Sequence, residues 1–305
     1  MEKHRKKLIK NAAVFDGHSS GLAHGKKIVI EDDLVTEITA DEVSEENFDE
    51  VFDGTGMVAM PGMTDAHVHM GCLFAKGEFP VDYATVLTVA KCKDALMAGF
   101  TTFRDAGSVS EGLKLAFDEG VLPGPRIYPC GAYISQTCGH GDSEYAHTYR
   151  DIQYRHPSST VLADGVPEII RAVREQFYRG ASHIKLMATE ILNRHEDIRL
   201  LFGTDMMITG PDYQVEQSED IRYYEKRFGT MRALRALTGT ANEVFALTTY
   251  QNPYPKGKIG VLEAGSYADL LLVDGDPTKS VSVLADTDHL RLIMKGGTVY
   301  KNTLC

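Results

Sequence analysis

Two histidines separated by one residue, His67 and His69, are the strongest candidates for chemistry in this sequence. They end an apolar run, and side chains on a strand alternate between its two faces, so both imidazoles are expected on the same side. Two nitrogen donors placed in this way can bind one metal ion. A His-x-His pair also occurs without any metal, and that ordinary role stays open on the motif alone.

A lysine inside an apolar strand is the second candidate. Lys185 lies within Ile184-Lys185-Leu186-Met187, where a charged amine costs several kcal/mol unless it is paired or neutral. Burial lowers the pKa of an amine, and a neutral amine can be carboxylated by CO2 to a carbamate whose two oxygens bridge two ions. The alternative is that Lys185 reaches solvent or pairs with a carboxylate.

An aspartate after a strand is the third candidate. Asp205 follows Gly203 and Thr204 at the end of an expected strand. A carboxylate there can ligate a metal and accept a proton. The alternative is a turn residue or a helix N-cap, which is the usual role of an isolated Thr-Asp pair.

The middle of the chain, which carries these candidates, alternates between expected strands and helices. The expected strands are 57–60 leading into 65–69, then 100–105, 126–128, 183–187 and 199–202. The expected helices are 83–98, 112–119 and 166–178, with a helix-like 191–196 and a helical region from 216 to 247. This alternation predicts βα units around a parallel sheet. In barrels of this type the chemistry collects at the carboxyl ends of the strands.

Both ends of the chain show the sequence pattern of short β-strands rather than alternating strands and helices. Apolar runs with turns between them predict a hairpin over 27–38, a strand over 268–273 and a second hairpin over 291–300. We therefore expect a small β-sandwich domain assembled from residues 1–56 and 252–305. Residues 57–251 are expected to form the (β/α) barrel domain.

Several motifs spread along the chain match one family. They are Met60-Pro61-Gly62 through His69, Gly99-Phe100-Thr101-Thr102-Phe103-Arg104-Asp105, Ser135-Gln136-Thr137-Cys138-Gly139-His140-Gly141-Asp142, Gly180 through Thr189, Phe202-Gly203-Thr204-Asp205, and Gly265-Ser266-Tyr267-Ala268-Asp269-Leu270. With them the chain resembles the amidohydrolase superfamily. Within it, the chain is most similar to the subgroup of metal-dependent carboxypeptidases, prolidase-like dipeptidases, imidazolonepropionase-like proteins and ochratoxinase. The resemblance implies a (β/α)8 TIM barrel.

The resemblance also implies roles for the candidates. His67 and His69 would bind the more buried of two divalent ions, zinc being the expected metal, and carboxylated Lys185 would bridge both. Asp205 would ligate the buried ion and shuttle a proton, and His140 would bind substrate, although a loop histidine that orders a glycine-rich turn is an equal alternative. A hydroxide bridging the ions would attack an amide carbonyl.

The neighbouring polar residues are assigned ordinary roles. Arg104 and Asp105 are expected to stabilise the end of their strand. His183, nearer the start of its strand than Lys185, is expected to fill a lower layer of the barrel interior.

The resemblance implies an acyl-dipeptide or an N-acyl amino acid as substrate, with an imidazolone-type cyclic amide as the alternative. A different class is also open: a metal-free barrel that only binds a ligand or acts as a scaffold. A pure β-sandwich is excluded, since expected strands and helices alternate over most of the chain.

The sequence departs from the family after Thr189. Five barrel strands are expected here, whereas a closed barrel has eight. The two histidines that would complete the second metal's ligands are absent, and His195 lies in a polar setting that does not favour ligation. Either about 100 residues are omitted near Thr189, or the polypeptide lacks them. We favour omission, because a barrel without three strands exposes two sheet edges and an open core.

Composition narrows the setting of the protein. The formal net charge of −11 argues against a nucleic-acid or anionic-membrane surface. Five scattered cysteines without a CxxC pair indicate free thiols in a reducing compartment. Neither a signal peptide nor an apolar membrane span is recognised, so a cytoplasmic location is expected. The subgroup is commonly oligomeric, which implies a homo-oligomer.

Overall fold

The computed structural model describes residues 5–70, 81–107, 111–137, 139, 141–142, 160–186, 199–207 and 213–304. His140, His195 and the stretch around Thr189 lie outside the described residues. The predictions made for them, including the substrate-binding role of His140 and the omission near Thr189, therefore stay predictions.

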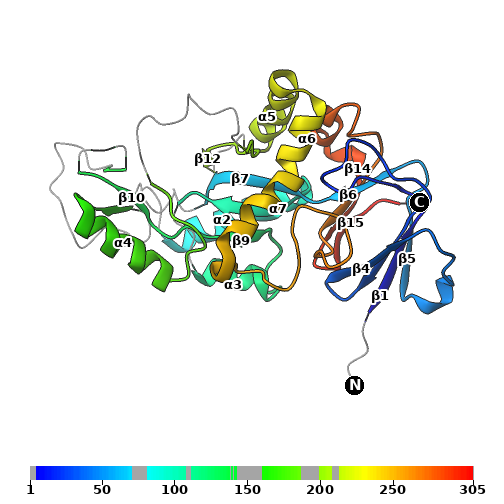
Figure 1. The fold of residues 1–305 in the computed structure, drawn as a ribbon, viewed down its shortest axis with the longest axis horizontal. Coiled ribbons are helices and arrows are strands. Elements are labelled where there is room, and N and C mark those ends of the chain that lie inside the picture. The colour runs from blue at the N-terminus through cyan, green and yellow to red at the C-terminus, as the bar shows by residue number, and fades with distance from the viewer. Residues whose placement is uncertain are drawn as a thin grey trace.

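Both ends of the chain build two sheets on one side of the molecule (Figure 1). The first sheet has the order β4-β3-β1-β5 and consists of β1 (Lys6–Lys10), β3 (Lys27–Glu31), β4 (Leu34–Thr39) and β5 (Glu50–Asp53). The second has the order β15-β14-β13-β6-β2 and consists of β2 (Ala13–Val14), β6 (Val58–Pro61), β13 (Leu270–Val273), β14 (Leu290–Lys295) and β15 (Thr298–Asn302). Both predicted hairpins are confirmed, as the antiparallel pairs β3–β4 and β14–β15.

Strand β13 shows why its sequence is apolar throughout. Leu270 and Leu272 belong to the hydrophobic cluster that joins the two terminal sheets. Leu271 and Val273 point the other way, into the cluster that joins the second sheet to the middle of the chain. Because successive side chains alternate between faces, a strand covered on both faces needs an uninterrupted apolar run. This strand therefore ties the terminal sheets to the part that carries the candidate site.

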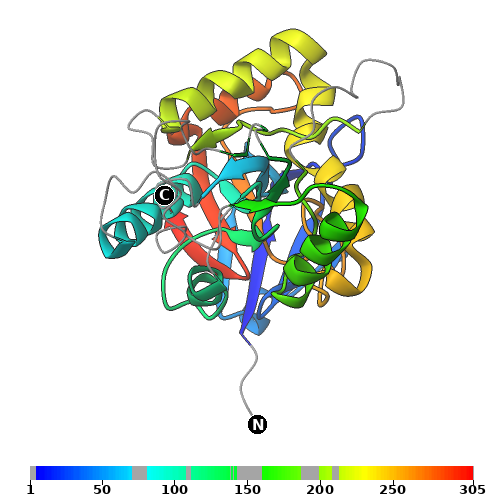
Figure 2. The same cartoon turned by 90° about the vertical axis from the view of Figure 1, so that its left-hand side faces the viewer.

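A parallel sheet lies in the middle of the chain. Its order is β12-β7-β8-β9, and it consists of β7 (Met63–His69), β8 (Phe100–Asp105), β9 (Arg126–Tyr128) and β12 (Met206–Met207). All three pairs are parallel. The predicted helices 83–98, 112–119 and 166–178 are confirmed as α2 (Val81–Met97), α3 (Glu111–Asp118) and α4 (Val166–Tyr178). Figure 2 shows helices arranged around this sheet, as an α/β fold requires.

The two strands predicted after α4 differ from the observed structure. In the described part of 183–187, Leu186 makes a single parallel bridge to Ile134, which lies in β10 (Tyr133–Ser135), and β10 pairs with β11 (Thr160–Leu162). The predicted strand 199–202 is wrong: the strand is β12, at 206–207. The chain reaches it through Asp205, whose φ of 55° interrupts an extended ladder.

The predicted helical region 216–247 is divided into three helices. They are α5 (Tyr213–Phe228), α6 (Thr230–Leu237) and α7 (Gly239–Phe245), and η2 (Ala246–Gln251) follows them. The breaks fall at Gly229, with φ 83°, and at Thr238, with φ −135° and ψ −99°. The short 3-10 helices η1 (Glu45–Asn47), η3 (Val281–Ala285) and η4 (Thr287–His289) lie in the terminal parts of the chain.

Three further observations bear on the predicted organisation. β6, which falls within the predicted barrel range, pairs with β13 and β2 of the terminal sheet. Among the described strands, none joins β12 to the segment of Leu186, so this part of the chain shows an open arrangement of parallel strands. Across the residues described, no helix combines the length and apolarity needed to cross a bilayer.

Candidate metal centre

The carboxyl end of β7 brings His67 and His69 to one side of the sheet, as strand alternation requires. Their ring centroids are 5.4 Å apart. The Nε2 atoms of His67 and His69 lie 3.0 Å and 3.1 Å from Oδ1 of Asp205. The three predicted ligand residues therefore converge on one point, although Asp205 comes from a segment 136 residues further along the chain than His69.

A tight turn delivers Asp205 to this point. The backbone N–H of Asp205 donates to the carbonyl of His67 at 2.7 Å, and Asp205 adopts a left-handed φ of 55°. Aspartate tolerates this conformation better than most residues. Gly203 comes so close to His67 that an added Cβ would lie 2.7 Å from the Cβ of His67. The close approach explains why a glycine precedes Thr204 and Asp205.

Lys185 also reaches this cluster. Its Nζ lies 2.9 Å from Nε2 of His67, and its carbonyl accepts a hydrogen bond of 2.9 Å from the N–H of Ile134. Burial lowers the pKa of the Lys185 amine, although the nearby Asp205 carboxylate acts in the opposite direction. The structure thus places all four ligand candidates together, with the lysine beside one of the imidazoles.

The electrostatics of the site keep His67 neutral. Burial, followed by the positive charge of Lys185, lowers the pKa of His67 to about 4. An imidazole must be neutral to bind a metal, so His67 is ready to act as a ligand near neutral pH.

The donor set fits one divalent ion. The ligand atoms of His67, His69 and Asp205 all lie within 4.8 Å of one another, and two imidazole nitrogens with a carboxylate oxygen are typical ligands of zinc. They form the single group of three or more His, Cys, Asp or Glu ligands found in the part of the chain that the structure describes. Ligands for a second ion, apart from Lys185, are therefore not provided by the described residues.

Asp65 is a polar residue of the site that the sequence did not single out. It is fully buried on β7, and burial raises the pKa of its carboxyl to about 6 although four hydrogen bonds oppose the shift. The signal was present in the sequence as an acidic residue within the apolar run before His67.

The end of β8 supports the histidine strand. Asp105 accepts hydrogen bonds from the N–H of Met70 at 3.3 Å and of Gly107 at 3.2 Å, and Arg104 donates to the carbonyl of Ala66 at 3.4 Å. These contacts agree with the expected role of the pair at the end of its strand, which stays a prediction. Nε2 of His183 lies 3.2 Å from the Asp105 carbonyl, and burial lowers the pKa of His183 to about 3. His183 is thus a neutral interior residue.

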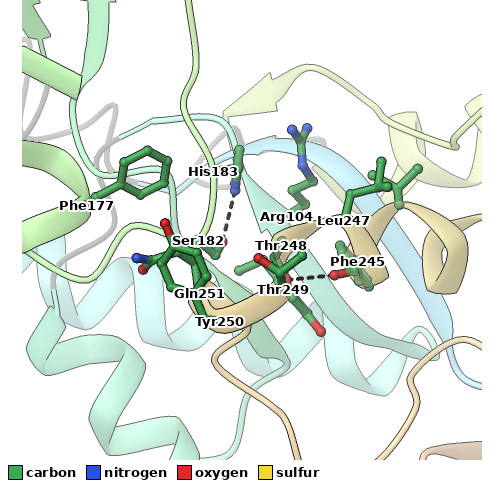
Figure 3. Close-up of a pocket in the computed structure, with 12 residues that line it drawn as sticks. Arg104, Phe177, Ser182, His183, Phe245, Leu247, Thr248, Thr249, Tyr250 and Gln251 are labelled. Atoms are coloured by element: carbon green, nitrogen blue, oxygen red, sulfur yellow. Dashed lines mark hydrogen bonds between the residues drawn. The ribbon is translucent and has the colours of Figure 1, made fainter. Parts of the chain in front are cut away.

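A cavity of about 360 Å3 is lined by residues outside the cluster (Figure 3). None of His67, His69, Lys185 and Asp205 lines it. Arg104 and His183 do, and they are drawn on the same side in Figure 3. The remaining lining side chains come from β9, α4, Ser182 and the α7–η2 region: Tyr128, Phe177, Ser182, Val244, Phe245, Leu247, Thr248, Thr249, Tyr250 and Gln251.

The fold and the cluster define a class: α/β proteins with a candidate metal site at the carboxyl ends of parallel strands. Residues 58–198 match the amidohydrolase family profile. Ochratoxinase of Aspergillus niger is 34% identical over 152 residues, which cover 43% of this chain and 31% of that enzyme. The match thus spans about a third of the length of this curated relative. A 5-methylthioadenosine/S-adenosylhomocysteine deaminase of Dictyoglomus turgidum is 33% identical over 70 residues, covering 23% of this chain and 16% of that enzyme.

Solved structures share the fold over nearly the whole chain. A prolidase complexed with N-methylphosphonate-L-proline superposes with a TM-score of 0.82 at 22% identity, covering 97% of this chain and 100% of that chain. Aspergillus niger ochratoxinase superposes with a TM-score of 0.75 at 18% identity, covering 99% and 96%. The fold is therefore of the TIM-barrel-like α/β type. Residues 58–198 are thus similar to an amidohydrolase family domain, and the ochratoxinase match and the fold neighbours support an amidohydrolase superfamily member.

Proposed function

We propose that this chain is a metal-dependent hydrolase of amide or peptide bonds. The observation that carries the proposal is the convergence of two imidazoles from the end of β7, one carboxylate from the turn before β12 and the amine of Lys185. Similarity to the amidohydrolase family supports it, since ochratoxinase and prolidase-like structures are among the relatives.

His67, His69 and Asp205 would hold the ion, because their ligand atoms are already gathered. A divalent ion held there polarises a substrate carbonyl and lowers the pKa of water. His67, kept neutral by burial, enters the site in the form that a ligand requires. The chain's own contribution is thus to gather three donors in advance, at positions set by β7 and the turn before β12.

Asp205 would move the proton. Its side chain is 70% exposed, and its Oδ1 faces both imidazoles, which leaves Oδ2 as the atom to accept a proton from the attacking water. Attack by the water oxygen would form the carbon–oxygen bond of a tetrahedral adduct, and Asp205 would then pass the proton to the nitrogen of the scissile bond, so that the carbon–nitrogen bond breaks as the adduct collapses. One water is consumed, and an acid and an amine are released.

Lys185 would provide the bridging ligand for a second ion. Burial lowers the pKa of this amine and so increases its neutral fraction; the neutral amine can form a nitrogen–carbon bond to CO2 and release a proton to give a carbamate. The remaining ligands of a second zinc ion would come from outside the described residues.

We further propose an N-acyl amino acid or acyl-dipeptide as the substrate. The structural neighbours include a prolidase and a Xaa-Pro dipeptidase. The cavity offers aromatic and aliphatic walls together with the guanidinium of Arg104, which would suit an apolar group and a free carboxylate. An imidazolone-type cyclic amide lacks this combination of groups and is the second candidate.

The architecture that would carry this activity is a barrel over 57–251 and a composite β-sandwich from 1–56 and 252–305. The hydrophobic cluster shared by the two terminal sheets supports the sandwich, while the pairing of β6 with β13 would move the boundary a few residues into the barrel range. We also propose a homo-oligomer, on the resemblance to the subgroup.

The test is metal content and hydrolysis measured on the whole chain. After incubation with zinc chloride and bicarbonate, we expect about two equivalents of zinc per chain and hydrolysis of N-acyl amino acids. The corresponding C-terminal amides should be hydrolysed more slowly. Asp205→Asn should lower kcat by about 100- to 10,000-fold, and the control Asp276→Asn, on a turn of the terminal part, should not. A chain that binds no zinc and hydrolyses nothing would favour a ligand-binding or scaffold protein instead.

A further inference from the structure

A single buried carboxylate connects the two segments that carry the metal ligands. Asp65 is 0% exposed and accepts hydrogen bonds from four donors. Its Oδ2 accepts from Oγ1 of Thr204 at 2.8 Å and from Nε2 of Gln217 at 3.3 Å. Its Oδ1 accepts from the N–H groups of Thr204 and His67, each at 3.2 Å.

The donors come from three different elements. His67 lies on β7 itself, Thr204 belongs to the turn before β12, and Gln217 lies on α5. Thr204 directly precedes Asp205, so its two hydrogen bonds hold the backbone from which the ligand carboxylate projects. The contact between Thr204 and Asp65 spans 139 residues of sequence. Asp65 therefore fixes the relative positions of the histidine pair and of Asp205.

Apart from the contacts of its Oδ1 with the two imidazoles, Asp205 is held mainly through the backbone of its turn. Its side chain is 70% exposed, its backbone occupies the left-handed region, and the strand that follows, β12, is only two residues long. The backbone hydrogen bond to His67 holds the turn on one side, and the bonds from Thr204 to Asp65 hold it on the other. Without them, the turn could relax toward a more common backbone conformation and withdraw the carboxylate.

We propose that Asp65 is a positioning residue, which sets the distance between the imidazole Nε2 atoms and the carboxylate of Asp205 and thereby the affinity for a divalent ion. The proposal rests on the proposed function, because it requires that the cluster bind metal. Asp65 would thus be a determinant of metal affinity that is not itself a metal ligand. Partners that orient metal ligands typically change metal affinity or activity by about 10- to 100-fold when they are removed.

The experiment uses the full chain and cobalt(II) chloride as the probe, with the Kd measured by calorimetry and by the visible absorption of bound cobalt. Two variants weaken the network to different degrees: Asp65→Asn keeps shape and volume, and Thr204→Val removes only the Oγ1 donor. Thr204→Ser restores that donor. Stability of the metal-free chain is measured by urea unfolding in parallel.

The matched control is Glu225→Gln. Glu225 also accepts several hydrogen bonds, from Thr230, Ser280, Val281 and Ser282, but these tie α5 to η3 rather than to the site. If Asp65 had only a structural role, Asp65→Asn and Glu225→Gln would behave alike: each would lose stability, and neither would lose affinity for cobalt.

We expect Asp65→Asn and Thr204→Val to raise the cobalt Kd by about 10- to 100-fold and to change the shape of the cobalt spectrum. Thr204→Ser and Glu225→Gln should keep the parent Kd. An unchanged Kd in Thr204→Val would overturn the positioning role while leaving the proposed function intact. If Asp65→Asn fails to fold, Thr204→Val decides the matter. A parent chain that binds no cobalt would overturn the proposed function, and the inference with it.

Discussion

Replacing Gly203 with alanine should damage the metal site through steric contact alone. The φ of Gly203 is not in the left-handed region, so alanine introduces no backbone strain there. Its Cβ would lie 2.7 Å from the Cβ and 3.1 Å from the N of His67. Carbon atoms pack at about 3.5–4.0 Å, so His67 or the turn at 203–205 must move by roughly 1 Å.

The structure gives the size of the effect. Inserting a methyl group into a packed position costs about 1–3 kcal/mol of unfolding free energy, and a displacement of about 1 Å at reacting groups can cost about 100-fold in rate. We therefore expect a stability loss in that range, measured by urea unfolding, together with a loss of zinc affinity and of kcat.

The control for this substitution is Gly21→Ala. Its added Cβ meets nothing within 4 Å, so stability and zinc affinity should stay at the parent values. If Gly203→Ala retains the parent stability, zinc Kd and kcat, the close packing of Gly203 against His67 does not control the site, and the reasoning is refuted.

Three further predictions concern metal, charge pairing and pH. Removal of metal by a chelator should abolish hydrolysis. In urea unfolding, zinc at 100 times its Kd should raise the unfolding free energy of the parent chain by about 2.7 kcal/mol. The same zinc concentration should raise the unfolding free energy of Asp205→Asn much less. Asp269→Ala should lower the unfolding free energy by about 3–5 kcal/mol in the same assay, because the buried guanidinium of Arg126, which lies 2.7 Å from Asp269, would lose its carboxylate partner. An equal loss in the control Asp276→Ala would contradict this prediction. Burial lowers the pKa of Lys295 from 10.5 to about 8, so between pH 8 and 10.5 the unfolded chain binds more protons than the folded chain. The unfolding free energy of the parent chain should therefore rise over this pH range, relative to Lys295→Met, by up to roughly 3 kcal/mol. A difference independent of pH would show that Lys295 keeps its ordinary pKa in the folded chain.

Local patterns were sufficient for much of the fold. The helices α2, α3 and α4 and the hairpins β3–β4 and β14–β15 follow from apolar periodicity and from turn residues, and the structure confirms them. These elements are decided by contacts between residues that are close in sequence. The helical region predicted over 216–247 is confirmed, but its division into three helices at Gly229 and Thr238 was not predicted.

The sequence by itself determined which residues could carry the chemistry. Strand alternation placed His67 and His69 on one side, and the family motifs singled out Lys185 and Asp205 before any distance was known. Residue type and spacing are sufficient for this because ligand chemistry is a property of the side chains themselves.

Only the tertiary structure decided how these residues are held. The left-handed turn at Asp205, the closeness of Gly203 to His67 and the hydrogen bonds of Asp65 to Thr204 all join segments more than 130 residues apart. Such contacts depend on which strands become neighbours in the sheet. A buried carboxylate acquires distant partners only after the chain has brought them to it, so the sequence marks Asp65 as an acidic residue in an apolar run but does not show which groups it contacts.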